Sequence, residues 1–383
     1  MIAIPAKSTP PINPRKRPDK ISPRHEKIKL VMSDFHLGRG RRLKDGSINA
    51  LEDFFWDYKF KELIEFHTKA PYDDAEIELI FNGDMLNLIL TDYHGHFTVI
   101  LTEAVSLFKL HAIIEGHPVF FRTLREFLKH PKRSLTYIIG NHDQEMLWDK
   151  ARFVFEKAVG AKVNWQNTHY QVDGVHIEHG HQYEAVNRFD PTQPFLSKNL
   201  PEPIINLPWG SLFAVQFIIK LKMLRPMIDK VRPFRQLILW CLVHDSWFAI
   251  TNIFRLVIYF ISTRFTKNRY RQSSLKTTVR ILRETSVYPD LTDAAKRILR
   301  TPEVHTVIFG HTHVHKHLQI GDGKQYINLG TWNETLSLDL STYGKYTKLT
   351  YARIEYREAD KAPLVYLRHW IGHVPVEDDA VVA

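Results

Sequence analysis

Three short apolar runs in the first half of the chain each end in a cluster of polar residues. The runs cover residues 27–33, 77–81 and 135–139 and are rich in residues that favour β-strands. The clusters that follow them are Asp34-Phe35-His36, Gly83-Asp84 and Gly140-Asn141-His142-Asp143. Wholly apolar strands are typical of covered sheets, and open α/β sheets place ligand chemistry at the carboxyl ends of their strands. The pattern therefore predicts an α/β fold with a polar site at one sheet edge.

The rest of the chain continues this organisation. Residues 119–129 place apolar side chains on one side of a predicted helix, so β and α segments alternate. Asp173-Gly174 is a tight-turn signal and predicts a hairpin that ends at His179. Residues 304–309 predict a strand that leads into Gly310-His311-Thr312-His313. Further strands are predicted over residues 324–330, 346–356 and 363–370.

Composition divides the chain into four parts. Residues 1–27 are rich in proline and carry a net charge of +5, which predicts a disordered basic arm. Residues 28–199 and 276–370 are predicted to form a catalytic domain, with an insertion at 200–275 and a tail at 371–383. The insertion carries +8 over residues 201–275. The summed net charge of the arm and the insertion is greater than the +10 of the whole chain. The remaining residues therefore carry a net charge of −3 and are mildly acidic.

The insertion is dense in large apolar and aromatic residues. Residues 212–223 and 247–262 are long enough for helices. A membrane span needs roughly 18 uninterrupted apolar residues, and charged residues interrupt every window of that length in the insertion. Basic residues mixed with aromatic ones suit a phospholipid surface better than a DNA duplex. We expect a helical lid that rests on an anionic membrane through Lys220, Lys222 and Arg225 and shelters an apolar part of the substrate. The alternative is that its apolar surface packs on the catalytic domain.

The single cysteine, Cys241, excludes an internal disulfide, and no secretion signal opens the chain. A cytoplasmic location is therefore expected, on the inner face of the membrane if the insertion binds lipid.

Five polar clusters stand out once His179-Gly180-His181 and residues 310–313 are added to the three above. Burying aspartate and histidine is unfavourable unless something compensates for lost hydration. Two divalent cations would do so, and carboxylate with imidazole suits Mn²⁺, Fe or Zn²⁺, whereas the lack of cysteine in the clusters argues against structural zinc. Two cations about 4 Å apart need a shared anionic ligand and clamp the attacking and leaving oxygens of a phosphoryl displacement. Asp84 is the candidate bridge.

The motifs SDFHLG, NGD, GNHD, HGH and GHTH, in this order, resemble those of the calcineurin-like metallophosphoesterases over residues 28–356, the insertion excepted. The resemblance implies a β-sandwich flanked by helices and two divalent metal ions, with Mn²⁺ the first expectation. It also implies hydrolysis of a phosphoester or pyrophosphate bond by a metal-bridging hydroxide. One implied metal site consists of Asp34, His36, Asp84 and His313. The other consists of Asp84, Asn141, His179 and His311.

Other residues near the motifs have narrower expected roles. His142 corresponds to the family's catalytic histidine, and Asp143 is predicted either to orient it or to cap the helix that follows. Arg39, Arg41 and Arg42 either bind a substrate phosphate or form an exposed basic loop. Residues 328–333, NLGTWN, resemble a late loop that supports the site in bacterial members. Four further histidines are not assigned as ligands, namely His176, His181, His315 and His317.

The motifs look most like the bacterial branch that contains the UDP-2,3-diacylglucosamine hydrolases, which insert a helical lid at the same place. The chain departs from that branch in having His142 in place of an arginine and in its longer insertion. A DNA exonuclease of the SbcD type and a soluble nucleotide phosphodiesterase are the alternatives. The expected partner is thus a phosphorylated small molecule or lipid, with nucleic acid left open. A non-enzymatic scaffold is disfavoured because all seven expected ligands are present beside His142.

Overall fold

The computed structural model describes residues 27–228, 230–232, 234–264, 290–338, 344–357 and 362–372. The predictions for the basic arm before residue 27, for residues 265–289 and for the tail beyond residue 372 lie outside the described residues.

A six-stranded sheet holds the first three predicted strands side by side, in the order β16-β15-β1-β2-β3-β4. Strands β1 to β4 pair in parallel, whereas β15 is antiparallel to both β1 and β16. The strands are β1 (Lys27–Met32), β2 (Glu76–Asn82), β3 (Arg133–Ile138), β4 (Asn164–Gln166), β15 (Leu349–Tyr356) and β16 (Leu364–Trp370). Because β1, β2 and β3 are parallel, the polar clusters that follow them share one edge of the sheet.

A second, five-stranded sheet carries the remaining two clusters, in the order β11-β12-β10-β6-β5. Its strands are β5 (His169–Val172), β6 (Val175–Glu178), β10 (Thr306–Phe309), β11 (His315–Gln319) and β12 (Gln325–Leu329). Strands β5 and β6 form the predicted hairpin, and His179 directly follows β6. Strand β10 lies parallel to β6, so the residues after both strands emerge together.

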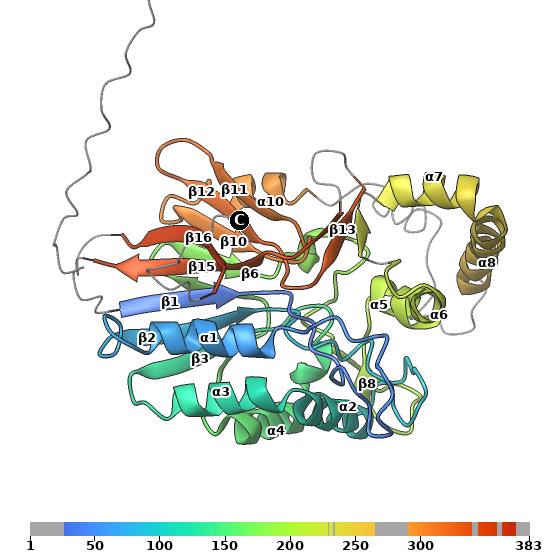
Figure 1. The fold of residues 1–383 in the computed structure, drawn as a ribbon, viewed down its shortest axis with the longest axis horizontal. Coiled ribbons are helices and arrows are strands. Elements are labelled where there is room, and N and C mark those ends of the chain that lie inside the picture. The colour runs from blue at the N-terminus through green and yellow to red at the C-terminus, as the bar shows by residue number, and fades with distance from the viewer. Residues whose placement is uncertain are drawn as a thin grey trace, which may run out of the picture.

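The two sheets pack face to face, and helices cover their outer faces (Figure 1). Alternation along β1 shows the arrangement: Val31 packs against Ile177 and Ile308 of the second sheet, whereas Leu30 and Met32 point to the helices. The helices on that side are α1 (Asp57–His67), α2 (Glu103–Gly116), α3 (Pro118–Leu128) and α4 (Asp149–Val159), and α10 (Thr292–Ile298) covers the second sheet. The predicted α/β sandwich flanked by helices is confirmed.

The insertion contains further helices, which lie at one end of the molecule (Figure 1). They are α5 (Trp209–Phe213), a π-helical turn (Ala214–Ile218), α6 (Ile219–Leu224), α7 (Phe234–His244) and α8 (Ser246–Arg264). None of the helices in the described part of the chain is long and apolar enough to cross a membrane. Two small sheets complete the fold: β7 (Phe195–Leu196) with β8 (Ile204–Ile205), and β9 (Val231–Arg232) with β13 (Thr335–Ser337) and β14 (Gly344–Tyr346).

Candidate metal centre

The five polar clusters meet where the strands of both sheets end. Backbone hydrogen bonds join their loops, because the amides of Asp34 and His36 donate to the carbonyls of Gly83 (3.2 Å) and Asp84 (2.9 Å). The Gly310 amide likewise donates to the His179 carbonyl at 3.0 Å. Five of the seven predicted ligands are buried, and two, His311 and His313, are half-buried. The structure therefore brings all seven together, while their binding of metal stays a prediction.

The first group of predicted ligands consists of Asp34, His36 and His313. Oδ1 of Asp34 lies 3.3 Å from Nε2 of His313 and 3.8 Å from Nε2 of His36, and the two Nε2 atoms are 3.0 Å apart. Two imidazole nitrogens that each lie about 2.1 Å from one cation, at a right angle, would be about 3.0 Å apart. The spacing of this group therefore fits a shared cation.

Asp84 connects the first group to the second. Its Oδ2 lies 3.9 Å from Nε2 of His36 and 3.1 Å from Nε2 of His179. Ligand atoms of Asp84, His179 and His311 all lie within 4.8 Å of one another, as do those of Asp34, His36 and His313. Asn141 completes the predicted second set, and its buried Oδ1 has no hydrogen-bond partner among the described residues. The carboxylate of Asp84 thus lies between the two groups, while its role as a bridge between metals stays a prediction.

Five of the seven predicted ligands have a left-handed backbone. They are Asp34, His36, Asp84, His311 and His313, with φ between 53° and 69°. Residues other than glycine adopt this conformation at a cost of about 1–3 kcal/mol each, and such strain persists where the surrounding structure imposes it, which is often at functional sites. Since only four other non-glycine residues of the described chain have positive φ, the strain is concentrated at these loops.

Two glycines allow the loops to approach each other closely. A Cβ at Gly83, whose φ is +77°, would collide with the ring of His179. A Cβ at Gly140 would collide with the carboxylate of Asp84. The glycines of the NGD and GNHD motifs therefore leave the space in which the two groups of ligands meet.

The carboxylates of Asp34 and Asp84 and the imidazole of His179 stabilise each other's charged forms. Burial alone would raise the pKa of Asp34 and of Asp84, but His179 and other imidazoles hold both pKa values well below the usual range. Burial would lower the pKa of His179, yet Asp84 and Asp34 raise it to about 10. His179 is aligned by its Nδ1, which donates to the Asn82 carbonyl at 2.8 Å and leaves Nε2 toward Asp84. These carboxylates thus strongly attract positive charge.

His142 lies beside both groups. Its amide donates to Asp84 Oδ1 at 2.8 Å, its ring lies 4.6 Å from that of His36, and it lines a small pocket of about 60 Å³. Its Nδ1 lies 2.9 Å from the side-chain oxygen of Asn87. Burial lowers the pKa of His142 to about 3, so its ring is neutral at pH 7. A neutral imidazole held through Nδ1 offers Nε2 to a molecule in the pocket.

Neither predicted role of Asp143 agrees with the structure. Its carboxylate accepts from the amide of Gly140 (2.6 Å) and the hydroxyl of Tyr137 (2.7 Å), and it makes no side-chain cap to the following turn, Gln144–Leu147. The ring of His142 is held by Asn87 instead. Burial, together with Asp84, raises the pKa of Asp143 to about 7. Asp143 therefore shapes the loop and does not orient the catalytic candidate.

The three predicted substrate arginines do not line this pocket. Arg39 forms an ion pair with Asp92, and Arg41 and Arg42 are exposed, as the alternative of a basic loop predicted. The pocket instead contains Lys230, which comes from the insertion. The three arginines closely follow the SDFHLG motif in sequence, but their loop leads away from the pocket. Residues 39–42 turn toward α2, where Gly40 packs on Gly116.

Sequence patterns also missed Glu184, whose carboxylate bonds to Nε2 of His311. It lies only a few residues after the HGH motif, but in a stretch without periodicity, so nothing but position could have indicated it. The NLGTWN loop supports the site as expected: Thr331 donates to the carbonyl of Asp34 at 2.7 Å, and Trp332 stacks on Phe35 with ring centroids 4.4 Å apart.

The four unassigned histidines have other surroundings. His176 lies 3.0 Å from a carboxylate oxygen of Glu178, and His317 lies 2.8 Å from the side-chain oxygen of Gln325. His315 lies 3.2 Å from the ammonium of Lys348. His181 is fully buried and stacks on Phe189, with ring centroids 5.0 Å apart.

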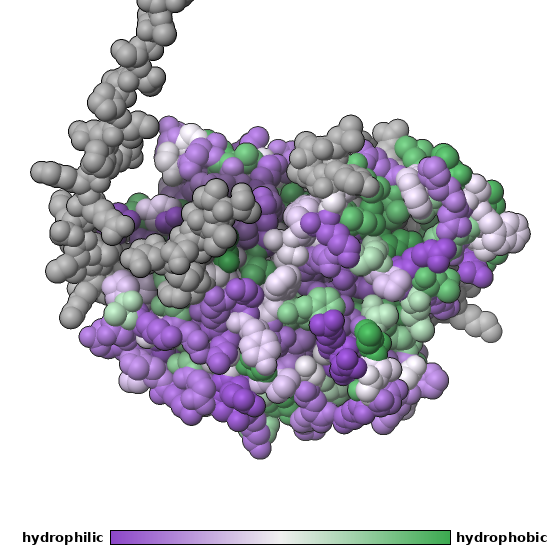
Figure 2. Space-filling view, in the orientation of Figure 1, coloured by the Kyte–Doolittle hydropathy of each residue, from purple (hydrophilic) through white to green (hydrophobic). Residues whose placement is uncertain are grey.

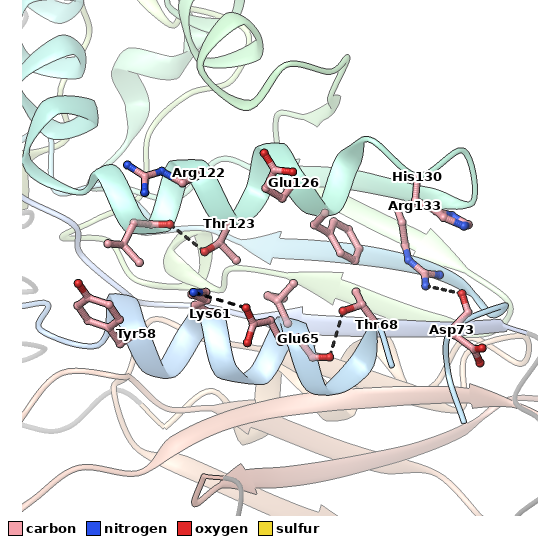
Figure 3. Close-up of a pocket in the computed structure, with 13 residues that line it drawn as sticks. Tyr58, Lys61, Glu65, Thr68, Asp73, Arg122, Thr123, Glu126, His130 and Arg133 are labelled. Atoms are coloured by element: carbon pink, nitrogen blue, oxygen red, sulfur yellow. Dashed lines mark hydrogen bonds and ion pairs between the residues drawn. The ribbon is translucent and has the colours of Figure 1, made fainter. Parts of the chain in front are cut away.

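A larger pocket of about 520 Å³ lies elsewhere, between α1 and α3 (Figure 3). Side chains of both charges line it, including Lys61 and Glu65, which pair at 3.5 Å along α1, and Arg122 of α3. None of the predicted site residues lines this pocket. Pocket size therefore does not identify the candidate centre, whereas the convergence of strand-end ligands does.

Comparisons with known proteins add little to this geometry. No family model and no curated protein matches the chain. Among solved structures, the chain is similar to a predicted phosphoesterase from Streptococcus pneumoniae, at 10% identity over 91% of this chain and 92% of that one, with a TM-score of 0.28. It is also similar to a dimetal phosphatase from Danio rerio (9% identity, 89% and 98%, TM-score 0.35) and to Vacuolar Protein Sorting 29 from Cryptosporidium parvum (11%, 90% and 98%, 0.28). Likenesses this slight carry no argument about activity.

Proposed function

We propose that this protein is a metal-dependent hydrolase of phosphoester or pyrophosphate bonds. The observation that carries the proposal is the pair of neighbouring ligand groups, Asp34-His36-His313 and Asp84-His179-His311, which Asp84 joins through its 3.9 Å approach to His36, with His142 beside them. Strained backbone at five of the ligands supports it, because strain of this kind is found where function requires a fixed geometry.

The residues present fit a pair of divalent cations. Asp34, His36 and His313 would hold one, Asn141, His179 and His311 the other, and Asp84 would contact both. When bound, such a pair supplies an activated water near neutral pH and neutralises charge on phosphate oxygens. Mixed carboxylate and imidazole ligands favour Mn²⁺ as the native ion, with Fe or Zn²⁺ as alternatives.

In this proposal His142 acts at the leaving group of the substrate. It lines the pocket with Nδ1 held by Asn87, so its Nε2 faces an entering phosphate or leaving group. Because Nδ1 keeps the ring proton in its bond to Asn87, Nε2 is free to take up a second proton from the attacking water; the protonated ring then stabilises negative charge on the leaving oxygen or passes that proton to it.

The finer proposal is a lipid-linked nucleotide as substrate. Its support is the pair of contacting helices α7 and α8, of which α8 has large exposed apolar residues: Trp247 is 82% exposed, Phe254 65% and Ile250 57%. Figure 2 shows hydrophobic surface gathered at the end of the molecule where Figure 1 places α7. An exposed apolar face on a segment that also supplies Lys230 to the pocket suits a substrate with both an acyl part and a phosphate.

A substrate screen tests the proposed function. The protein, loaded with Mn²⁺, Fe²⁺ or Zn²⁺ in turn, is assayed on a UDP-linked lipid, soluble phosphodiesters and linear DNA. Asp84→Asn serves as the control, because it removes the shared negative charge and should abolish turnover and lower the metal content. Absence of hydrolysis in every class, or an Asp84→Asn protein that keeps two metals and full turnover, would overturn the proposal. Preference for linear DNA would favour the exonuclease.

A further inference from the structure

A lysine of the insertion is fixed at the wall of the candidate catalytic pocket. The ammonium of Lys230 lies 2.9 Å from Oδ1 of Asp53, whose Oδ2 lies 2.6 Å from the ammonium of Lys222. Burial would raise the pKa of Asp53, but the two ammonium groups hold that pKa well below the usual range. Asp53 is therefore ionised and anchors Lys230 from the catalytic domain.

The backbone on both sides of Lys230 is also fixed. Its amide donates to the carbonyl of Met227 at 3.0 Å, and its carbonyl accepts from the amide of Leu336 at 3.0 Å. The next residues, Val231 and Arg232, form β9 and pair with β13. Strand β13 closely follows Asn333 and Glu334, which line the same pocket. Backbone hydrogen bonds and strand pairing thus tie the base of the insertion to the segment that lines the pocket.

The position of Lys230 gives it access to a ligand. Its side chain is 11% exposed and lines the pocket together with His36, His142 and His313. An ammonium group has three N–H donors. Among the described residues its one carboxylate partner is Asp53, so donors remain for an anion in the pocket. Glu334, the other acidic residue at this wall, pairs with Lys345 at 2.8 Å.

We propose that Lys230 binds a second negative charge of the substrate at the cleaved phosphate, and that the site therefore selects substrates that have one. In a phosphomonoester this charge is on the cleaved phosphate itself and in a pyrophosphate it is on the neighbouring phosphate, whereas a simple phosphodiester has none. The inference rests on the proposed function and deepens it, because Lys230 takes the role that the sequence suggested for Arg39, Arg41 and Arg42. A charge-assisted bond of this kind is stronger than one between neutral groups.

The test compares Lys230→Gln with the parent on p-nitrophenyl phosphate, UDP-glucose and bis-p-nitrophenyl phosphate. We expect kcat/KM to fall at least about tenfold on p-nitrophenyl phosphate, UDP-glucose or both, and by less than about twofold on the diester. The substrate that loses more identifies the monoester or the pyrophosphate as the natural class. Lys220→Gln is the matched control, because Lys220 is an exposed lysine of the same insertion that does not line the pocket, and it should leave kcat/KM on all three soluble substrates unchanged.

An equal fall on all three substrates, or no fall, would overturn the role of Lys230. Lys230→Arg keeps the charge and should largely restore the preference, which separates loss of charge from loss of folding. If the parent hydrolyses none of these substrates, the proposed function has failed on them, yet calorimetric binding of inorganic pyrophosphate to the Mn²⁺-loaded protein still tests Lys230. Binding at least about tenfold weaker in Lys230→Gln supports the inference, and equal binding contradicts it.

Discussion

At the scale of single residues, His142 lines the pocket and has its ring atom Nδ1 in a hydrogen bond. The side chain of Asn87 holds Nδ1, the backbone amide of His142 is fixed on Asp84, and burial keeps the ring neutral. In the proposed function this ring moves a proton at the pocket and belongs to neither predicted metal set, although one of its ring nitrogens lies within 4.8 Å of ligand atoms of His36 and Asp84. Its removal should therefore separate catalysis from metal binding.

We predict that His142→Ala retains the metal content of the parent but loses about two or more orders of magnitude in kcat. Asn87→Ala should cause a smaller loss, because the ring remains but is less well oriented. Metal content is measured by elemental analysis after gel filtration, and kcat on a soluble phosphoester. If metal were lost together with activity in His142→Ala, the histidine would be a ligand.

At the scale of elements, an ion-pair group joins the loop after β1, which carries the predicted ligands Asp34 and His36, to the helices. His117, at the junction of α2 and α3, lies 3.0 Å from Asp57 of α1 and 3.5 Å from Glu52. Glu52 in turn accepts from the amides of Gly38 (3.1 Å) and Gly40 (2.6 Å), just after Asp34 and His36. A protonated His117 therefore helps to hold the loop that carries two predicted ligands.

This group makes stability depend on pH. Burial would lower the pKa of His117, but Asp57 and Glu52 raise it to about 9 from its ordinary value of 6.5. Because the folded-state pKa is the higher one, the contribution is complete below about pH 6.5 and is lost as pH rises through about 9. Its size is on the order of 3 kcal/mol.

Denaturant unfolding of the parent and of His117→Gln from pH 6 to 10 measures the effect. The difference in unfolding free energy should be largest at the acid end and shrink toward pH 10. A difference that does not change with pH would mean that His117 acts by packing alone.

The polar clusters at the strand ends could be predicted from the sequence, because each apolar run and the polar residues that follow it are neighbours in the chain. Asp34, Asp84 and Asn141 directly follow apolar runs, and parallel pairing then brings them together. Lys230 and Glu184 have no such context, since their roles depend on which distant segment packs beside them. Asp143 shows the opposite error: adjacency to His142 in sequence suggested contact, but the sharp turn directs the carboxylate back to Gly140.

At the scale of the whole molecule, the two halves of the insertion differ: packing on the catalytic domain, the alternative expectation, is seen for one half, whereas the membrane contact stays a prediction. The α5–α6 half packs on the catalytic domain, where Val215 and Ile219 contact Ile89 and Leu90. Lys222 is fully buried against Asp53, so the expectation that it contacts a membrane is wrong, and Arg225 pairs with Asp245 at 3.0 Å. The α7–α8 half has the exposed apolar surface instead.

The outer surface of α8 has the spacing of a helical stripe. Trp247, Ile250, Phe254, Ile258 and Ile261 recur every three or four residues, and each is at least 49% exposed. Apolar stripes on helices that face water mark contact surfaces. We propose that the partner is the surface of an anionic bilayer, because aromatic and aliphatic side chains enter its interface while the exposed Lys220 and Arg255 interact with its headgroups.

The last prediction follows from this stripe. Changing Trp247, Ile250 and Phe254 together to serine should weaken partition onto anionic liposomes at least about tenfold, since each apolar side chain contributes on the order of 1 kcal/mol or more when it leaves water. Turnover of a lipid-linked substrate should fall in parallel, while hydrolysis of p-nitrophenyl phosphate should not change, because Lys230 still lines the pocket and the α5–α6 half still packs on the catalytic domain. Cosedimentation measures the partition, with gel filtration of parent and variant as the control. Equal partition by both proteins would contradict the membrane contact, and a parent that dimerises through the stripe while the variant is monomeric would assign this surface to a second copy of the chain.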